Sequence, residues 1–361
     1  MTWKCAAIDH GLTIFPFGKI GPCCQIASAA LRPVSDITVP HRFQDLKTED
    51  PPAACVYCVN QEKSGQKSYR QMFNEQATDD PGIQFLDLRN TNLCNFKCRY
   101  CGPHFSNQWA EELGIVPSLK STDASAYYQT VITPSLKWLY STGGEPLLNI
   151  EHWELLENLI EKNLAPNIEL LYNTNLSTVR YKDKDIYNIW KKFKRVNVNV
   201  SIDAIGPPLE MIRHGANWKK ILTNLETLLL LDVAVVRLVP VMSILNIWFA
   251  PELWRFAKEK NISISPSILY GPDYLSLDCL PDALQPLALK CLDEIDSLSM
   301  IPPAMIESVR LQIMENKNKD LFKHTLNHVM LLDHSRKENL FDILPFKEIA
   351  KNIILNNNEY Q

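Results

Sequence analysis

The central part of the chain alternates short apolar segments with longer amphipathic ones. Six segments have the length and apolar content of buried strands, namely 84–89, 136–141, 168–173, 196–202, 235–242 and 262–268. Between them, apolar residues recur at helical spacing, most clearly in 152–163, 218–231 and 250–260. Repeated alternation of strands and helices predicts an α/β fold with a parallel sheet or a partial barrel.

The two flanks of this region have a different pattern. Residues 1–80 hold few long periodic segments and many turn signals, such as Gly21-Pro22. Such a segment needs a staple, and a metal is the available one. From about residue 282 the pattern is helical and polar, and it closes on Asn356–Glu359, which we expect to be frayed. We therefore expect a small N-terminal domain over 1–82, a barrel over 83–275 and a helical extension over 276–361.

Composition adds a cellular setting. The 361 residues are 46% hydrophobic and 22% charged, as in ordinary globular proteins, and the net charge of −4 does not favour nucleic acid as a partner. The longest apolar run, 228–236, is broken by Asp232 and is far shorter than the roughly 20 residues of a membrane helix. The N-terminus has no secretory pattern, so we expect a cytoplasmic protein. In that compartment the ten cysteines are poor disulfide candidates and better metal ligands.

Three of these cysteines follow the first predicted strand, in the pattern Cys94-x3-Cys98-x2-Cys101. Three thiolates alone cannot close a tetrahedral zinc site. They can hold three irons of a [4Fe–4S] cluster and leave the fourth iron open for a substrate. The alternative is that three core thiols match this spacing by chance.

With Tyr100 directly before the third cysteine, the motif resembles the cluster loop of the radical S-adenosylmethionine (radical SAM) superfamily. The resemblance implies a partial (β/α)6 barrel and an oxygen-sensitive [4Fe–4S] cluster whose open iron is chelated by SAM. It also implies that one electron splits SAM into methionine and a 5′-deoxyadenosyl radical, which abstracts hydrogen from a substrate. The electron would come from an external reductant such as flavodoxin or ferredoxin.

A second segment carries the same resemblance. Gly143, Gly144 and Glu145 follow the second predicted strand and are similar to the Gly-Gly-Glu-Pro segment with which the family contacts the amino group of SAM. Taken alone, Gly-Gly-Glu is a common turn. Glycines at these positions would let the backbone approach a ligand closely.

Further polar residues end the later strands. Ser201 and Asp203 are similar to the ribose-contacting strand end of the family, although Asp203 also suits a helix cap or a turn. Asn175 ends the third strand and offers another polar contact. Arg213 is a candidate for the SAM carboxylate, with a solvated surface arginine as the alternative. The resemblance covers about residues 84 to 270.

A second group of cysteines precedes the predicted barrel. Its opening, with four residues between Gly18 and Cys23, resembles the start of SPASM and twitch domains, which hold auxiliary [4Fe–4S] clusters. Those domains usually follow the barrel, and four ligands correspond to the single-cluster twitch type. Cys24 is spare, because Cys23 keeps the spacing from Gly18. A structural zinc is the alternative, since four cysteines with a Cys-x2-Cys pair are common for zinc. The expected ligands are Cys5, Cys23, Cys55 and Cys58.

The sequence says least about the substrate. The leading hypothesis is a peptide or protein, because auxiliary-cluster members of the family frequently modify these. The alternative is a sugar, nucleoside or other small metabolite, and a non-catalytic iron–sulfur electron carrier or scaffold is the alternative from another class. Of the two late cysteines, Cys279 and Cys291, we expect inert buried thiols, although a thiol near the barrel mouth would be able to give hydrogen to a substrate radical.

Overall fold

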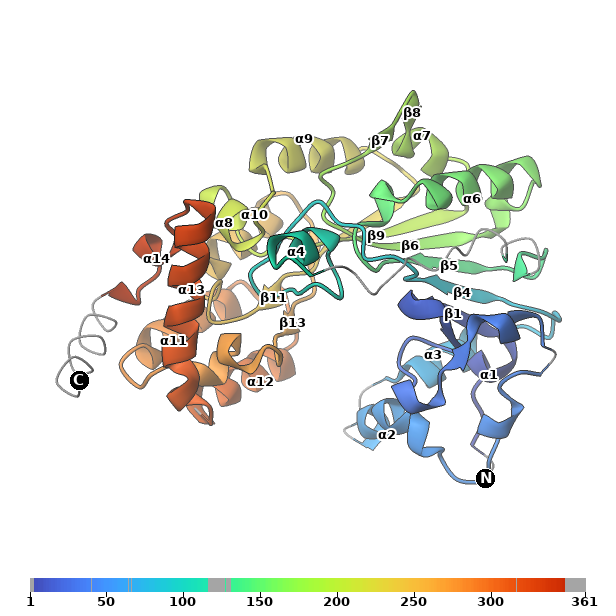
Figure 1. Cartoon of the computed structure of the whole chain (residues 1–361), viewed down its shortest axis with the longest axis horizontal. Helices are drawn as coiled ribbons and strands as arrows, with labels where there is room; N and C mark the ends of the chain where they lie inside the picture. Colours follow the sequence, from blue (N-terminus) through green and yellow to red (C-terminus); the bar gives the residue numbers. More distant parts are fainter. Residues whose placement is uncertain are drawn as a thin grey trace.

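The computed structural model describes residues 3–39, 41–63, 65, 67–115, 127, 131–315 and 317–347 of the chain. Within this part, nine strands form one sheet in the order β12-β10-β9-β6-β5-β4-β1-β2-β3, and helices surround it (Figure 1). The predicted frayed tail at Asn356–Glu359 lies outside the described residues.

Six neighbouring strands of the sheet are parallel, and each overlaps one of the six predicted segments. They are β4 (Phe85–Leu88), β5 (Trp138–Ser141), β6 (Glu169–Thr174), β9 (Arg195–Val200), β10 (Ala234–Leu238) and β12 (Ser263–Ile264). The predicted helices are present as α6 (Ile150–Glu161), α9 (Trp218–Leu228) and α10 (Ala250–Glu259). The predicted α/β partial barrel is therefore confirmed.

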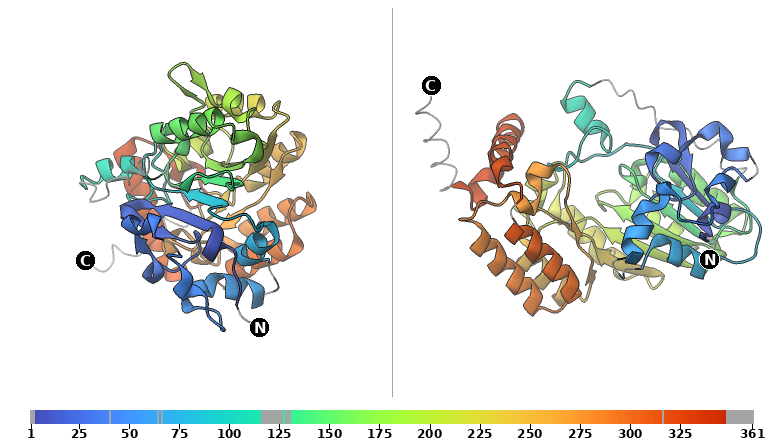
Figure 2. Two further views of the ribbon diagram at one scale, coloured as in Figure 1. Left: turned by 90° about the vertical axis from the view of Figure 1, so that its right-hand side faces the viewer. Right: turned by 90° about the horizontal axis from the view of Figure 1, so that it is seen from below.

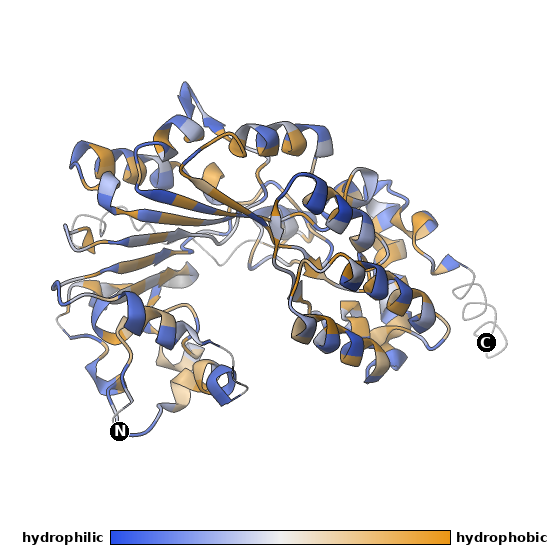
Figure 3. Cartoon of the chain, turned by 180° about the vertical axis from the view of Figure 1, so that it is seen from behind, coloured by the Kyte–Doolittle hydropathy of each residue, from blue (hydrophilic) through white to orange (hydrophobic). Residues whose placement is uncertain are grey.

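The two faces of this sheet differ in burial. In β9, the sequence Arg-Val-Asn-Val-Asn-Val puts every valine on a fully buried face and the asparagines on a half-exposed one. The strand β6 alternates in the same way. Helices α6, α9 and α7 (Ile186–Trp190) cover the buried face, with Trp153 and Trp190 in the core (Figure 1). The opposite face is left to the N-terminal segment and the C-terminal helices, which lie at its two ends (Figure 3).

The N-terminal segment continues the sheet rather than standing beside it. Strand β1 (Gly11–Phe15) pairs in parallel with β4, and β2 (Lys19–Gly21) and β3 (Arg32–Pro33) follow as antiparallel strands, with β3 at the edge. The sequence pattern did not predict these strands. Helix α3 (Tyr69–Gln76), which starts at a capping box on Ser68, brings Phe73 edge-on to Phe85 of β4 at 4.7 Å between ring centroids. Two shorter helices complete the segment, α1 (Ala7–His10) and α2 (Val56–Lys63).

The C-terminal extension is helical, as predicted. It lies at the far end of the molecule from the N-terminal segment (Figure 2). Its helices are α11 (Gln285–Ser297), α12 (Pro303–Glu315), α13 (Phe322–Arg336) and α14 (Leu340–Ile343). The remaining named elements are α4 (Asn107–Glu112), α8 (Pro207–Ile212), β7 (Arg180–Tyr181), β8 (Lys184–Asp185), β11 (Val241–Met242) and β13 (Ser267–Ile268). None of the helices in the described ranges has the length and hydropathy needed to cross a bilayer.

Candidate active site

The loop that carries Cys94, Cys98 and Cys101 follows β4 at the carboxyl end of the parallel strands, where α/β folds build their sites. Backbone bonds fix the loop to the chain around α8. The amide of Lys97 donates to the carbonyl of His214 at 2.8 Å, and the amide of Arg99 donates to Ile212 at 2.9 Å. Trp109 of α4 donates its indole N–H to the carbonyl of Cys98 at 2.9 Å. The loop is thus held from both sides.

A cavity of about 230 Å³ lies between this loop and the ends of β5, β6 and β9. Ten of the eleven residues that we expected around the cluster and SAM line it: Cys94, Cys98, Tyr100, Cys101, Gly143, Gly144, Glu145, Asn175, Ser201 and Arg213. The eleventh, Asp203, does not line the cavity but accepts hydrogen bonds from Tyr100 and Arg213, which do. Chain segments that are distant in sequence therefore meet at one place.

The two glycines of this site are needed for the packing of one loop on another. A Cβ on Gly144 would lie 2.2 Å from the carbonyl oxygen of Leu93, and one on Gly143, whose φ is +115°, would lie 2.7 Å from that of Thr91. The amide of Glu145 donates to the same Leu93 carbonyl at 2.7 Å. Close approach of the backbone is thus required by the cluster loop itself.

Glu145 is fully buried and joins the ends of two strands. Its carboxylate accepts from the Thr174 hydroxyl and the Asn175 amide, both at 2.7 Å, and from the amide of Leu147 at 3.2 Å. Burial raises the pKa of Glu145 to about 7, although these hydrogen bonds oppose the shift. The carboxylate is fixed in place and borders the cavity beside Cys94.

Asp203, Arg213 and Tyr100 form one buried network behind the cysteines. Arg213 donates to Asp203 at 2.7 and 3.1 Å, and the Tyr100 hydroxyl donates to the same carboxylate at 2.5 Å. Another guanidinium nitrogen of Arg213 lies 3.9 Å from the sulfur of Cys98. Arg213 is only 7% exposed, so the alternative of a solvated surface arginine is wrong. Burial alone would lower the pKa of Arg213, but Asp203 and the other groups beside it raise it well above its usual value.

The C-terminal helix α13 reaches the cluster loop through Arg99, which the sequence analysis did not single out. Arg99 is fully buried, donates to the carbonyls of Met211 and Val329 at 2.9 and 3.1 Å, and pairs with the carboxylates of Asp333 and Glu338. Because its partners Val329, Asp333 and Glu338 are more than 200 positions away along the chain, sequence spacing gave no signal for this contact.

Burial also shifts the pKa values of the three thiols. It raises the pKa of Cys94 to about 12, and it raises the pKa values of Cys98 and Cys101 as well. Without a metal these groups are neutral thiols. Three sulfurs bordering one cavity at strand ends fit a cluster that is held by three cysteines and open at its fourth iron. In the described ranges, no three His, Cys, Asp or Glu side chains are arranged as ligands of a single ion.

The N-terminal cysteines gather at a second place. A small cavity is lined by all four of the expected ligands together with Trp3 and Arg70, and those four are Cys5, Cys23, Cys55 and Cys58. Burial, and after it the neighbouring thiols Cys55 and Cys58, raise the pKa of Cys5 to about 11. Four thiols are a donor type that suits either a [4Fe–4S] cluster or zinc, although in the described ranges these side chains share a cavity and are not arranged around a single ion.

The spare thiol, Cys24, contacts a different group. Burial, and after it the carboxylate of Asp87 in β4, raise the pKa of Cys24 to about 12. Cys279 is fully buried, as expected of an inert thiol, with its sulfur 2.8 Å from the carbonyl of Asp273. It does not line the cavity at Cys94. Cys291 lies half-buried on α11.

Comparison with known proteins agrees with this geometry. Residues 90–248 match the family model of the radical SAM superfamily. This segment is a radical SAM domain. The match includes the cysteine loop and the ends of β5, β6 and β9.

Similar curated proteins include the GTP 3′,8-cyclase of Sulfurimonas denitrificans, which is 24% identical over 51% of this chain and 55% of its own length. The GTP 3′,8-cyclase of Helicobacter pylori is 29% identical over 34% of this chain and 36% of its own. The chain thus spans about half or less of the length of these relatives. Among solved structures, native anSMEcpe with bound AdoMet aligns with a TM-score of 0.42 and 18% identity over 58% of each chain.

Proposed function

We propose that this chain cleaves SAM reductively and uses the resulting 5′-deoxyadenosyl radical to abstract hydrogen from a substrate. The carrying observation is the single cavity that Cys94, Cys98 and Cys101 share with the ends of β5, β6 and β9 inside the radical SAM domain. A [4Fe–4S] cluster on these cysteines would supply the electron and an open iron for SAM.

The residues around the cavity have distinct tasks in this proposal. Gly144 and Glu145 hold the loop after β5 against the cluster loop, while Asn175 and Ser201 offer polar groups to SAM from the next strands. Arg213 shares its guanidinium between Asp203 and the sulfur of Cys98, so it orients this cysteine and supplies positive charge beside it. A ribose contact by Asp203 and a carboxylate contact by Arg213 remain predictions.

We further propose that Cys5, Cys23, Cys55 and Cys58 hold an auxiliary [4Fe–4S] cluster, with structural zinc as the alternative. Their common cavity supports one site with four ligands, and the position of Cys24 beside Asp87 supports its exclusion from that site. A cluster with four protein ligands has no iron free for SAM. It would hold the N-terminal segment together and pass electrons.

The substrate class is a separate question from SAM cleavage. A peptide or protein stays a prediction. The relatives named GTP 3′,8-cyclase favour the alternative of a small molecule such as a nucleotide. A non-catalytic electron carrier would have no use for a polar cavity at Glu145 and Ser201 beside its cluster.

The experiment that tests the central proposal uses protein reconstituted with iron and sulfide under anaerobic conditions. After reduction with SAM present, chromatography should detect 5′-deoxyadenosine. Replacing Cys94, Cys98 and Cys101 together by Ala should abolish it and remove about four irons per chain. The matched control is Cys291→Ala, which removes a half-buried thiol from α11. Undiminished cleavage in the triple variant would refute the proposal.

A further inference from the structure

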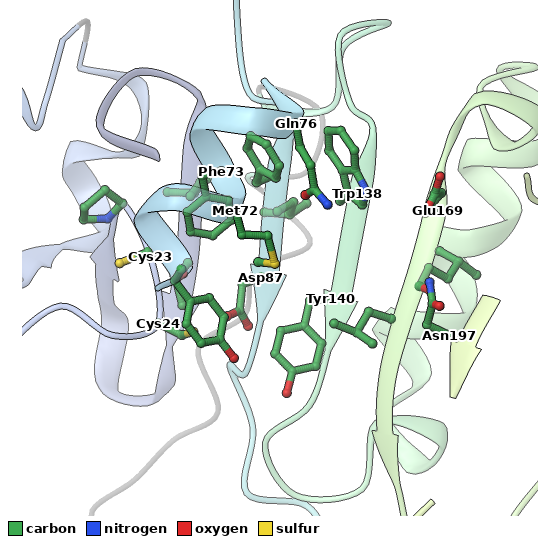
Figure 4. A pocket seen from close by; sticks show the side chains of 18 of the residues that line it. Cys23, Cys24, Met72, Phe73, Gln76, Asp87, Trp138, Tyr140, Glu169 and Asn197 are labelled. Atoms are coloured by element: carbon green, nitrogen blue, oxygen red, sulfur yellow. The ribbon is translucent and has the colours of Figure 1, made fainter. Parts of the chain in front are cut away.

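A second, more apolar cavity lies on the half-exposed face of the sheet (Figure 4). It encloses about 290 Å³ between helix α3 and strands β4, β5, β6, β9 and β10. This volume is near the lower end of the range for small-molecule sites, which is about 300–1,000 Å³. None of the residues expected to contact SAM lines it.

The same strands connect this cavity to the one at Cys94. Asn197 of β9 lines the more apolar cavity, and Ser201, directly after β9, lines the cavity at Cys94, which puts them about 13 Å apart at ~3.3 Å per residue. Arg237 of β10 and Val241 of β11 repeat this offset. A small molecule about 13 Å long that lies along the strands would therefore reach from one cavity to the other.

The apolar wall of the cavity is aromatic. Phe85 and Trp138 stack with ring centroids 4.6 Å apart and 9° between their planes, and Phe73 meets Phe85 edge-on. Trp138 is half-buried, and Tyr140 continues the wall along β5. Flat rings of this kind favour a planar aromatic ligand, because stacking adds to the burial of apolar area.

The charge in the cavity is unbalanced in one place. Asp87 is paired with Arg89 at 2.8 Å, and Glu169 is paired with Lys194 at 2.9 Å. Arg237 also lines the cavity and is exposed, and no carboxylate in the described part of the chain pairs with it. A guanidinium in this setting attracts an anionic group such as a phosphate or carboxylate.

We infer that this cavity binds the planar aromatic part of the substrate, with Arg237 holding an anionic group, while the reacting part extends along the strands to Ser201. The inference rests on the proposed function and names the chemistry of its substrate. A purine nucleotide has this chemistry, and so does an aromatic amino acid with a free carboxylate.

The test measures binding by calorimetry on the anaerobically reconstituted full chain, with GTP as one probe and N-acetyltryptophan as the other. One of the two should bind, and the one that binds identifies the source of the aromatic anion. Arg237→Gln should weaken that binding about tenfold, the loss typical of one charge-assisted hydrogen bond. Leu171→Trp, which fills the cavity from β6, should weaken it at least as much.

Two controls match these changes. Arg195→Gln removes an exposed arginine from neighbouring β9 outside the cavity, and Leu230→Trp adds an indole at a position that is 82% exposed. The inference is overturned if neither probe binds below about 1 mM, or if Arg237→Gln binds as tightly as its control. Should Leu171→Trp fail to fold, the exposed Arg237 still decides the outcome. If the unmodified chain does not bind SAM, that result would instead count against the proposed function.

Discussion

Replacing Arg99 by Met should show that the C-terminal helices help to build the cluster loop. Arg99 is fully buried, and the side chains of its partners Asp333 and Glu338 are only 11% and 15% exposed. The methionine would fill most of the space but remove Arg99 as a donor to both carboxylates and to two backbone carbonyls, while Asp333 keeps the amide of Phe341 and Glu338 keeps His214. Breaking a buried pair by removing one partner costs about 3–5 kcal/mol. We expect a loss of this size in the free energy of unfolding.

Urea titration of the apoprotein measures that loss, and iron analysis after reconstitution measures its effect on the loop. The iron content should fall, since Arg99 lies between Cys98 and Cys101. The control is Arg310→Met, because Arg310 pairs with Asp293 at a carboxylate that is 62% exposed, where a pair contributes about 0–1 kcal/mol. A loss below about 1 kcal/mol for Arg99→Met, with normal iron content, would contradict the role of Arg99 in joining the C-terminal helices to the cluster loop.

Two further outcomes follow from the site and the core. Cys23→Ala should lose the N-terminal metal while Cys24→Ala keeps it, and elemental analysis should find about eight irons per chain, against about four irons and one zinc if that site holds zinc. Burial lowers the pKa of His152 to about 3, so the unfolded chain binds a proton more readily than the folded one. Stability should therefore decline as the pH falls from about 6.5 towards 3, by at most about 1.4 kcal/mol per unit, and His152→Gln should show a flatter decline than the surface control His324→Gln.

The barrel could be predicted from the sequence because its strands are buried on the helix-covered face. The valines of β9 and the apolar residues of β6 give short segments that only a sheet explains, and all six predicted segments overlap a strand. The strands β1, β2 and β3 escaped prediction because turns separate them; β2 and β3 are also short. The place of β1 is decided by its pairing with β4, a contact across some 70 residues that no local pattern records, and β2 and β3 follow from β1.

The candidate site could be predicted where it depends on residue type and local spacing. Thiol spacing pointed to Cys94, Cys98 and Cys101, and resemblance pointed to Gly144 and Glu145. The tertiary contacts that hold these residues in place could not be predicted. The contact between Gly144 and Leu93, for example, exists only after two loops have met at neighbouring strand ends. Spacing along the chain describes a ligand set, whereas the groups that fix its geometry come from the tertiary fold.

The pairing of β1 with β4 explains how a thiol site that precedes the barrel in sequence can serve it. Because β1 and β2 extend the sheet at this edge, the chain directly after β2 brings Cys23 and Cys24 beside β4. Cys23 lines the small cavity of the N-terminal thiols and also the aromatic cavity on the open face. A metal at Cys23 would therefore border the same space as the substrate in our proposal. The order of the two cysteine groups along the chain is thus compatible with their acting on one molecule, because sheet pairing determines which face they share.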